Sequence, residues 1–508
     1  MAQRLRRAVL AGAALFSLPP AFPLAAQDVS LTSREGGYSV FGELHDFDGA
    51  FYVIETEHGL LTVNAEAVTC EGSGCPEFPF AVPEISIAGS RLMGEALFPR
   101  LLETFAAQNG LVLRNPGVGT AHDTYILEQS GSERAIARLN IDWSGSDQGL
   151  LSLMTGTANA ALSFNELQDD EVHVLVLAFD AFVPVVAPEN PMREISLKQL
   201  ADVLSGGIGN WSELGGPDLP LELHAWEAGA GYQQALEAAL LGPVDLPFSD
   251  VAQRHERPEA LAEAVARAPD AFGVTLLSQI GDARPLGLAG ECPLVSVADT
   301  LTVKAGDYLL IAPLFFHVPA RRLPPIAREL FGFMTAPEAQ PVLALAGFIT
   351  REPALWSAQA QERRLNDAVS AAGEEGPTRA ALEAVEEIMA GSSRLKTTFR
   401  FEPGEVQPGA RSRDALAELV REIEAGRFDG RTLVFVGLTD ADGPAQLNLD
   451  LSLQRAEAVR ATVRAAVPMM DQSLVAMEAY GFGQALPLAC DDTDQGRAVN
   501  RRVEVWVH

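Results

Sequence analysis

Two residues near the end of the chain have the types and spacing needed to hold a molecule that carries both charges. Asp440 follows an apolar run that ends at Val436, and Arg455 lies in a helical pattern that begins near Ser452. An ammonium pairs with a carboxylate, and arginine donates two parallel hydrogen bonds to a carboxylate better than lysine does. The pair could therefore bind a zwitterion. The alternative is a structural ion pair across a loop.

A strand, a loop and a helix must position this pair. The apolar run 433–436 indicates the strand, and Asp442 and Gly443 lie in a polar loop before the helical pattern. This order brings the end of the strand close to the first turn of the helix. An acid and a base can then face one cleft.

Four motifs around the pair occur in one order: a T-D-x-x-G loop, an N-x-x-L-S-x-x-R-A helix start, a G-x-G-x-x-x-P turn and an N-R-R-V strand. Their residues are Thr439, Asp440 and Gly443; Asn448, Leu451, Ser452, Arg455 and Ala456; Gly481, Gly483 and Pro487; and Asn500, Arg501, Arg502 and Val503. Residues 395–508 thereby resemble the OmpA-like peptidoglycan-binding family. The resemblance implies a βαβαββ domain that binds diaminopimelate of the cell wall. It assigns the ligand's amine to Asp440 and its carboxylate to Arg455, supported by Thr439, Asn448 and Arg502.

The length and charge of the chain limit the number of its domains and the kinds of partner it can have. A chain of 508 residues should hold two to four domains, because single cores rarely exceed about 300 residues. The formal net charge is −31. Such a surface is repelled by DNA, RNA and anionic lipids, so nucleic acid is excluded as a partner.

Residues 1–26 have the order of a secretory signal peptide. A basic start with Arg4, Arg6 and Arg7 precedes an apolar run over 8–18, and Leu24-Ala25-Ala26 suits cleavage before Gln27. No later run reaches the roughly 20 apolar residues of a transmembrane helix. We expect a periplasmic protein without a transmembrane segment. With the wall-binding resemblance, we expect it to associate with peptidoglycan and the outer membrane.

The four cysteines would meet an oxidising compartment after export. Cys70 and Cys75 enclose four residues, two of them glycine, and predict a disulfide. Cys292 and Cys490 are isolated, and both a pair across domains and two free thiols remain open. No second Cys/His pair lies nearby to complete a zinc site, so we expect no metal.

The remaining patterns predict a multidomain α/β protein. Short alternating strands over 36–83 indicate a small N-terminal β module, and strands alternate with helices over 84–351. The long apolar segment 174–187 suits a strand that crosses between two lobes. Residues 352–394 read as a helical connector to the C-terminal domain.

Several runs within 84–351 match known motifs. They are Ile87-Ala88-Gly89-Ser90, the run 145–150 (GSDQGL) with 155–158 (TGTA), Asn190-Pro191 before Ile195-Ser196-Leu197, and 206–217 (GGIGNWSELGGP). These runs resemble the phosphate-type periplasmic substrate-binding proteins. The resemblance implies two α/β lobes hinged over a ligand cleft, a small anionic ligand and an ABC transporter as partner.

The ligand residues of that family are replaced here. Trp226, Ala230 and Tyr232 stand where an arginine, a serine and a threonine are expected. A phosphate would lose a counter-charge and two donors, each costing on the order of 1 to 3 kcal/mol. Helix N-terminal amides remain as anion sites. They give the anion-cleft candidates, for which capping and turn roles are the alternative for all but Arg91: Ser90, Arg91, Ser146 and Asp147.

No motif of a hydrolase, metalloenzyme or nucleotide-binding protein occurs in the sequence. We therefore expect a non-enzymatic envelope protein without a cofactor, which binds peptidoglycan and carries a substrate-binding-like module with a degenerate phosphate site. Two alternatives remain open. One is a periplasmic receptor that passes phosphate or another small anion to an ABC transporter, and the other is a cell-wall hydrolase with an unrecognised site.

Overall fold

A computed structural model describes residues 28–34, 36–47, 51–75, 82–115, 122–132, 134–357, 359–371, 377–409, 412–468 and 474–508. The chain divides into two compact units, Met1–Pro83 and Glu84–His508. The expected signal peptide and its cleavage site lie outside the described residues. Within the described ranges, no helix is both long and apolar enough to cross a membrane.

The first unit is an antiparallel sheet in the order β4-β3-β2-β1-β5. Its strands are β1 (Asp28–Ser33), β2 (Ser39–Phe47), β3 (Phe51–Thr56), β4 (Gly59–Asn64) and β5 (Val68–Glu71). The sheet begins before the predicted start at residue 36, because Val29 and Leu31 alternate with polar residues and are buried in its core. Cys70 and Cys75 form the disulfide that the sequence predicted.

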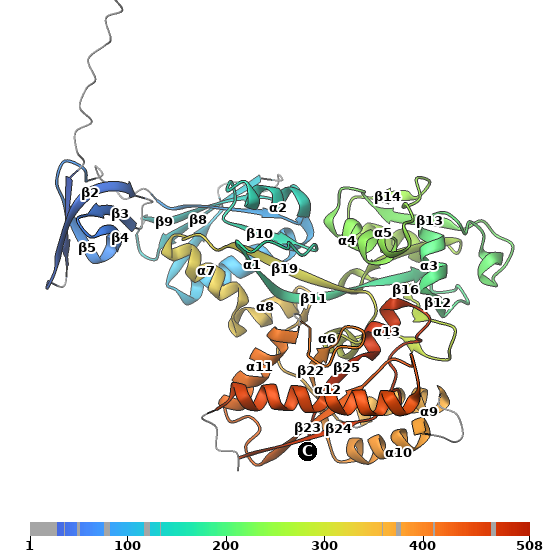
Figure 1. Cartoon of the computed structure of the whole chain (residues 1–508). Coiled ribbons are helices and arrows are strands. Elements are labelled where there is room, and N and C mark those ends of the chain that lie inside the picture. Colours follow the sequence, from blue (N-terminus) through green and yellow to red (C-terminus); the bar gives the residue numbers. More distant parts are fainter. Residues whose placement is uncertain are drawn as a thin grey trace, which may run out of the picture. The chain divides into compact units, whose positions relative to one another are not determined.

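Two long strands organise the first part of the second unit, the two-lobed module (residues 84–351). Strand β11 (Val172–Val186) pairs with β19 (Ile311–Pro319) over its first ten residues and with β15 (Ala271–Leu276) over its last five. Strand β11 therefore belongs to both halves of one sheet, as Figure 1 shows. The predicted crossing strand is confirmed.

Lobe 1 consists of β6 (Glu84–Gly89), α1 (Arg91–Gln108), β7 (Leu111–Arg114), β8 (His122–Gln129), β9 (Ala135–Asp142), α2 (Ser146–Met154), β10 (Ala160–Ser163), α7 (Pro325–Thr335) and α8 (Gln340–Leu345). Lobe 2 consists of β12 (Glu194–Ser196), α3 (Leu197–Leu204), β13 (Glu222–Trp226), α4 (Gly231–Leu240), β14 (Gln253–His255), α5 (Pro258–Arg267), β15 (Ala271–Leu276), β16 (Arg284–Pro285), β17 (Gly287–Ala289) and β18 (Val295–Ser296). Helix α6 (Thr300–Lys304) precedes β19, and β20 (Ile349–Thr350) pairs with β11.

Local sequence signals set several of these elements. The Ser196 hydroxyl accepts a hydrogen bond from the Gln199 amide, and the Gln199 side chain accepts one from the Ser196 amide, both at 3.0 Å. This is the predicted capping box, and it starts α3. Leu97, Leu101 and Phe105 of α1 are buried, as their helical spacing predicted.

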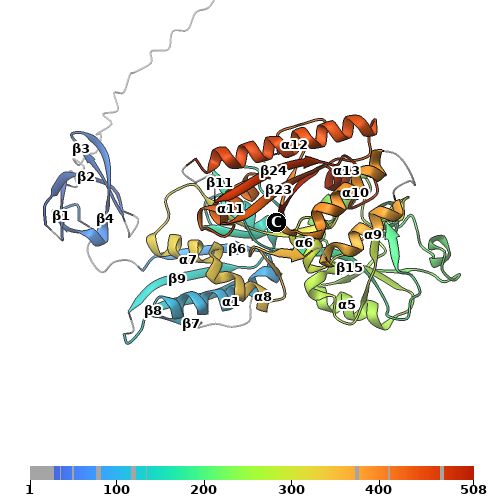
Figure 2. The same cartoon turned by 90° about the horizontal axis from the view of Figure 1, so that it is seen from below.

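The second part of this unit, the C-terminal module (residues 352–508), is a five-stranded sheet in the order β21-β22-β25-β23-β24. Its elements are β21 (Leu355–Ser357), α9 (Glu362–Ala371), α10 (Pro377–Ala390), β22 (Ser393–Arg400), α11 (Ser412–Glu424), β23 (Arg431–Leu438), α12 (Ala445–Ala466), β24 (Val475–Gly481), α13 (Asp494–Asn500) and β25 (Arg502–Val507). Helix α12 lies along β23 and β24 (Figure 2).

Helices cover both faces of this sheet. Apolar residues of α11 and α12 form one core with the odd-numbered residues of β25, such as Val503 and Val505. Leu382 and Val385 of α10 form a second core with Trp506 on the opposite face. Thus the connector predicted at 352–394 is not a separate linker, because its helices and β21 pack into the C-terminal module. The short helix α13 between the last two strands was not predicted.

Candidate functional site

Close glycine contacts bring Asp440 and Arg455 to one end of the C-terminal sheet. A Cβ atom on Gly437 would lie 1.9 Å from the Ser452 carbonyl oxygen, and one on Gly481 would lie 2.3 Å from the Leu453 nitrogen. Only glycine permits this approach of α12 to the ends of β23 and β24. The helix thereby carries Arg455 close enough to Asp440 for their charges to interact.

The Arg455 guanidinium is buried and incompletely bonded. Its Nε donates to the Glu405 carbonyl oxygen at 2.8 Å and its Nη2 to that of Glu402 at 3.3 Å, and the group lies over the Phe401 ring at 4.9 Å. Nη1 has no hydrogen-bond partner among the described residues. Burial lowers the pKa of Arg455 to about 10, although Asp440 acts in the opposite direction. An unpaired buried donor costs about 1 to 3 kcal/mol, so this nitrogen would gain from a bound acceptor.

Asp440 pairs with Arg501 and not with Arg455, its partner in the alternative of a structural ion pair. Its Oδ2 accepts a hydrogen bond from Arg501 Nη1 at 2.7 Å, and both side chains are largely buried. Arg501 also donates to the Phe401 carbonyl oxygen. The site therefore has one carboxylate and two guanidinium groups, and the sequence assigned only one of the latter.

Thr439 and Asn448 play different parts at this site. The Thr439 Oγ1 is buried and has no partner among the described residues. Asn448 Nδ2 donates to the carbonyl oxygens of Asp440 and Asp442, at 3.3 and 3.1 Å. Asn448 therefore holds the loop between β23 and α12, and the Thr439 hydroxyl remains available.

The structure places Arg502 away from the site, which corrects the predicted support role. Arg502 alternates with Val503 and so faces the opposite side of the sheet from Arg455. All three of its nitrogens are bonded there, to Glu504, the Asn500 carbonyl and the Leu486 carbonyl. The strand alternation of buried valines was the signal that could have separated Arg501 from Arg502.

Asp491 is a second carboxylate near the site that the sequence analysis missed. Its Oδ2 accepts from the Ala441 amide at 2.8 Å, and its Oδ1 accepts from Asn500 Nδ2 at 2.9 Å. Burial and then the nearby Asp440 charge raise the pKa of Asp491, against the effect of these two bonds. Asp491 thus fixes the residue that follows Asp440.

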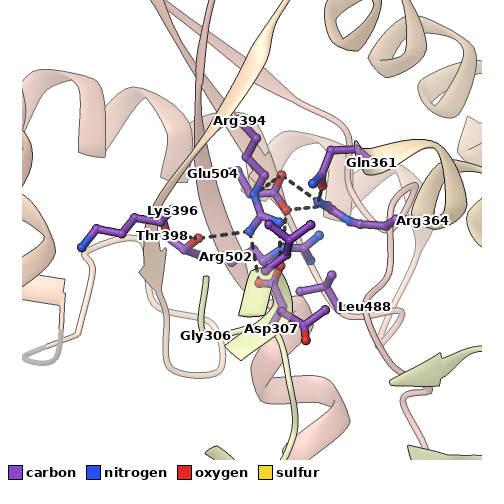
Figure 3. Close-up of polar contacts among 12 residues, drawn as sticks. Gly306, Asp307, Gln361, Arg364, Arg394, Lys396, Thr398, Leu488, Arg502 and Glu504 are labelled. Atoms are coloured by element: carbon purple, nitrogen blue, oxygen red, sulfur yellow. Dashed lines mark hydrogen bonds and ion pairs between the residues drawn. The ribbon is translucent and has the colours of Figure 1, made fainter. Parts of the chain in front are cut away.

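A buried ionic network joins the C-terminal module to the two-lobed module (Figure 3). Arg394 donates to Asp307 at 2.5 and 3.1 Å, and Glu504 pairs with Arg364, Arg394 and Arg502. Burial alone would raise the pKa of Glu504, but the three guanidinium groups outweigh it and hold the pKa well below its usual range. Asp307 therefore ties the chain before β19 to the C-terminal sheet.

The four anion-cleft candidates divide into two pairs. Ser90 and Ser146 are buried at the N-termini of α1 and α2, and the Ser146 hydroxyl accepts from the Phe164 amide at 3.4 Å. Arg91 is exposed and pairs with Glu95 on its own helix. Asp147 is also exposed and accepts from Asn165 Nδ2.

Side chains from lobe 2 fill the space beside Ser146. A Cβ atom on Gly231 would lie 1.9 Å from the Ser146 hydroxyl oxygen, so the two lobes touch at this point. Tyr232 packs edge-on against Trp226 at 4.7 Å and against Phe164 at 5.9 Å. Trp226 is fully buried, and burial raises the pKa of Tyr232 to about 12. Two residues that replace the expected anion ligands, Trp226 and Tyr232, are thus packed against each other as aromatic rings.

No group of three or more His, Cys, Asp or Glu side chains that could hold a metal is present in the described ranges. The isolated cysteines have a structural role instead, because Cys292 of lobe 2 and Cys490 of the C-terminal module form a disulfide. The sequence had left their pairing open. Their separation of 198 residues gave no local signal.

Two α/β lobes that share long crossing strands define the architecture of bilobal binding modules. A model of the family described as "PBP superfamily domain" matches residues 83–349, just over half of the chain, and the chain belongs to this family. Individual proteins that resemble this chain in sequence match shorter parts of it.

A phosphate-binding protein PstS of Borreliella burgdorferi is 27% identical over 111 residues, which are 21% of this chain and 40% of that protein. An outer membrane protein A of Bordetella avium is 34% identical over 112 residues, which are 22% of this chain and 53% of that protein. The chain thus spans about half or less of these relatives. The structure of an ABC-type phosphate transport receptor from Vibrio cholerae matches with 18% identity and a TM-score of 0.42, over 52% of this chain and 99% of that one.

Proposed function

We propose that this is a non-enzymatic envelope protein that binds peptidoglycan through the diaminopimelate residue of the wall peptide. The C-terminal module would supply the site. The observation that carries the proposal is the convergence of Asp440, Arg455 and Arg501, together with two buried donors, Arg455 Nη1 and Thr439 Oγ1, that have no partner among the described residues. The similarity of one segment to an outer membrane protein A supports an envelope location.

The geometry suggests how a zwitterion would enter. Arg455 now donates to two neutral carbonyls of the segment that follows β22, those of Glu402 and Glu405. A ligand carboxylate is a stronger acceptor than a carbonyl, so it would displace this segment and use Nη1 as well. The ligand's ammonium would then pair with Asp440, and Arg501 would turn from Asp440 towards the ligand carboxylate.

A pull-down on purified peptidoglycan tests the proposal. Asp440→Ala and Arg455→Ala should each lower the bound fraction, and competition with meso-diaminopimelate should show at least about a tenfold loss of affinity. Asp450→Ala and Arg464→Ala remove the same charges from exposed positions of α12 and are the matched controls. Full retention of both site variants would refute the proposal, and release of soluble wall fragments by the unaltered protein would show an enzyme instead.

A second candidate function is that of a receptor for phosphate or another small anion serving an ABC transporter. Membership of the two-lobed family and the similarity to proteins named phosphate-binding favour it. The aromatic filling around Ser146 and Trp226 opposes it. A ligand at 100 times its dissociation constant should add about 2.7 kcal/mol to stability, so thermal unfolding with phosphate and sulfate tests this function, and no shift with either anion would count against it.

A further inference from the structure

Residues 490–495, which run from the loop after β24 into the first turn of α13, contact lobe 2 at three points. Cys490 is bonded to Cys292, the Asp492 Oδ2 accepts from the Glu291 amide at 3.0 Å, and Gln495 Nε2 donates to the Ala239 carbonyl at 3.4 Å. Side chains of this segment also pack closely on Gly290, because a Cβ atom added to Gly290 would lie 2.5 Å from the Cβ of Cys490. This segment is therefore held on the two-lobed module.

Asp491 directly follows Cys490 and bonds residues of the candidate site. Its carboxylate accepts from the Ala441 amide and from Asn500 Nδ2, and its carbonyl oxygen accepts from Arg497 Nη1 at 2.6 Å. Asn500 in turn accepts from the Leu488 amide at 2.7 Å. Asp491 is thus fixed on both sides, and it bonds Ala441, the residue directly after Asp440.

We propose that Asp491 positions the Asp440 loop for its ligand, and that the Cys292–Cys490 disulfide holds Asp491 in place, so that lobe 2 and the C-terminal site are coupled. The inference rests on the proposed function for the identity of the ligand. The coupling itself does not depend on the identity of the ligand, because it is argued from the bond between Asp491 and Ala441.

Reduction of the Cys292–Cys490 disulfide should weaken the coupling between lobe 2 and the C-terminal site. Reduction adds two electrons and two protons to the disulfide and leaves two thiols, so an added dithiol reagent cuts the covalent tie to lobe 2. The bond from Ala441 to Asp491 would then be made less often. Loss of a hydrogen bond to a charged group corresponds to about a tenfold change in an equilibrium.

The experiment uses the full chain with Cys70→Ser and Cys75→Ser, so that only the Cys292–Cys490 disulfide can respond. Hydrogen–deuterium exchange is followed in peptides covering 439–447, with and without a dithiol reductant, and meso-diaminopimelate is titrated under the same two conditions. We expect reduction to raise both the exchange rate of this loop and the dissociation constant about tenfold. Peptides from the buried strand β23 should not change.

Two variants separate positioning from other roles, and both keep the disulfide. Asp491→Ala should give fast exchange and weak binding already in the oxidised protein, with no further response to reduction. Asp491→Asn keeps one oxygen that can accept from Ala441, although its amide nitrogen cannot accept from Asn500 Nδ2, so it should restore part of the affinity and the response to reduction. A direct contact of Asp491 with the ligand's ammonium would instead make Asp491→Asn as weak as Asp491→Ala.

Unchanged exchange on reduction, a redox response that persists in Asp491→Ala, or equal loss in the two Asp491 variants would overturn the proposal. If meso-diaminopimelate binds in neither redox state, the proposed function fails. The exchange measurement still decides the coupling in that case, since it needs no ligand.

Discussion

Asp307 and Arg394 form an ion pair at 2.5 Å in which both side chains are at most 5% exposed, although they belong to different modules. Two charges removed from water at one junction make the contact sensitive to the loss of either partner, because the other is left buried and unpaired. This relationship makes the junction between the modules a stability determinant.

Asp307→Ala should therefore lower the free energy of unfolding by about 3 to 5 kcal/mol. The measurement is urea-induced unfolding of the full chain, read as the change in the transition midpoint. Glu263→Ala removes a carboxylate from an exposed pair with Arg267 and should cost less than about 0.5 kcal/mol. Equal effects of the two variants would contradict this assignment.

Arg501 and Arg502 are neighbours with opposite expected phenotypes. Arg501→Ala should weaken peptidoglycan binding about tenfold, because Arg501 lies beside Asp440. Arg502→Ala should lower stability by about 3 kcal/mol, because it removes a partner of buried Glu504. Binding and unfolding measured on both variants check this, and a binding loss confined to Arg502→Ala would reverse the assignment.

Gly231→Ala should destabilise the contact between the lobes by about 1 to 3 kcal/mol, since its Cβ would overlap the Ser146 side chain. Ser146→Gly in the same chain should recover most of the loss by removing the overlapping atoms. Gly229→Ala is the control, because its Cβ would meet nothing within 4 Å. Thermal unfolding compares the variants, and failure of the double substitution to recover stability would show that the clash lies elsewhere.

Asp180 of β11 should make stability depend on pH. Burial raises the pKa of Asp180 from 3.8 to about 6, although bonds from Ser278 oppose the rise. The folded state then holds a proton that the unfolded state releases, so this contribution to stability is present below about pH 4 and is lost as pH rises to about 6. Asp180→Asn should remove the loss, which is about 3 kcal/mol.

Urea unfolding at pH 4, 5, 6 and 7 measures the difference between Asp180→Asn and the unaltered chain, which should grow with pH. Asp250→Asn changes an exposed aspartate and controls for the removal of one carboxylate. A difference that is constant across this range would contradict the buried, protonated state of Asp180.

Local patterns predicted the parts of the fold that depend on neighbouring residues. The Ser196–Gln199 capping box and the buried stripe of α1 each lie within a few turns of one helix, so sequence spacing specifies them. The long strand β11 was also visible as an apolar run.

Contacts between distant segments could not be predicted in the same way. Arg364 and Glu504 are 140 residues apart and Cys292 and Cys490 are 198 apart, so no spacing rule connects them. At the candidate site the residue types were predicted, and the alternation of valines in β25 carried the signal that separates Arg501 from Arg502. The packing of the 352–394 helices onto the sheet depends likewise on tertiary contacts.

The C-terminal sheet is attached to both sides of the crossing strands. Lys396 donates to the Arg351 carbonyl, and Arg351 donates to the Val176 carbonyl of β11, whereas Gln495 reaches Ala239 in lobe 2. A pull applied at the C-terminal module would reach the two lobes together and load them in parallel. The attachment of the C-terminal module to both parts would then resist rotation of one lobe against the other.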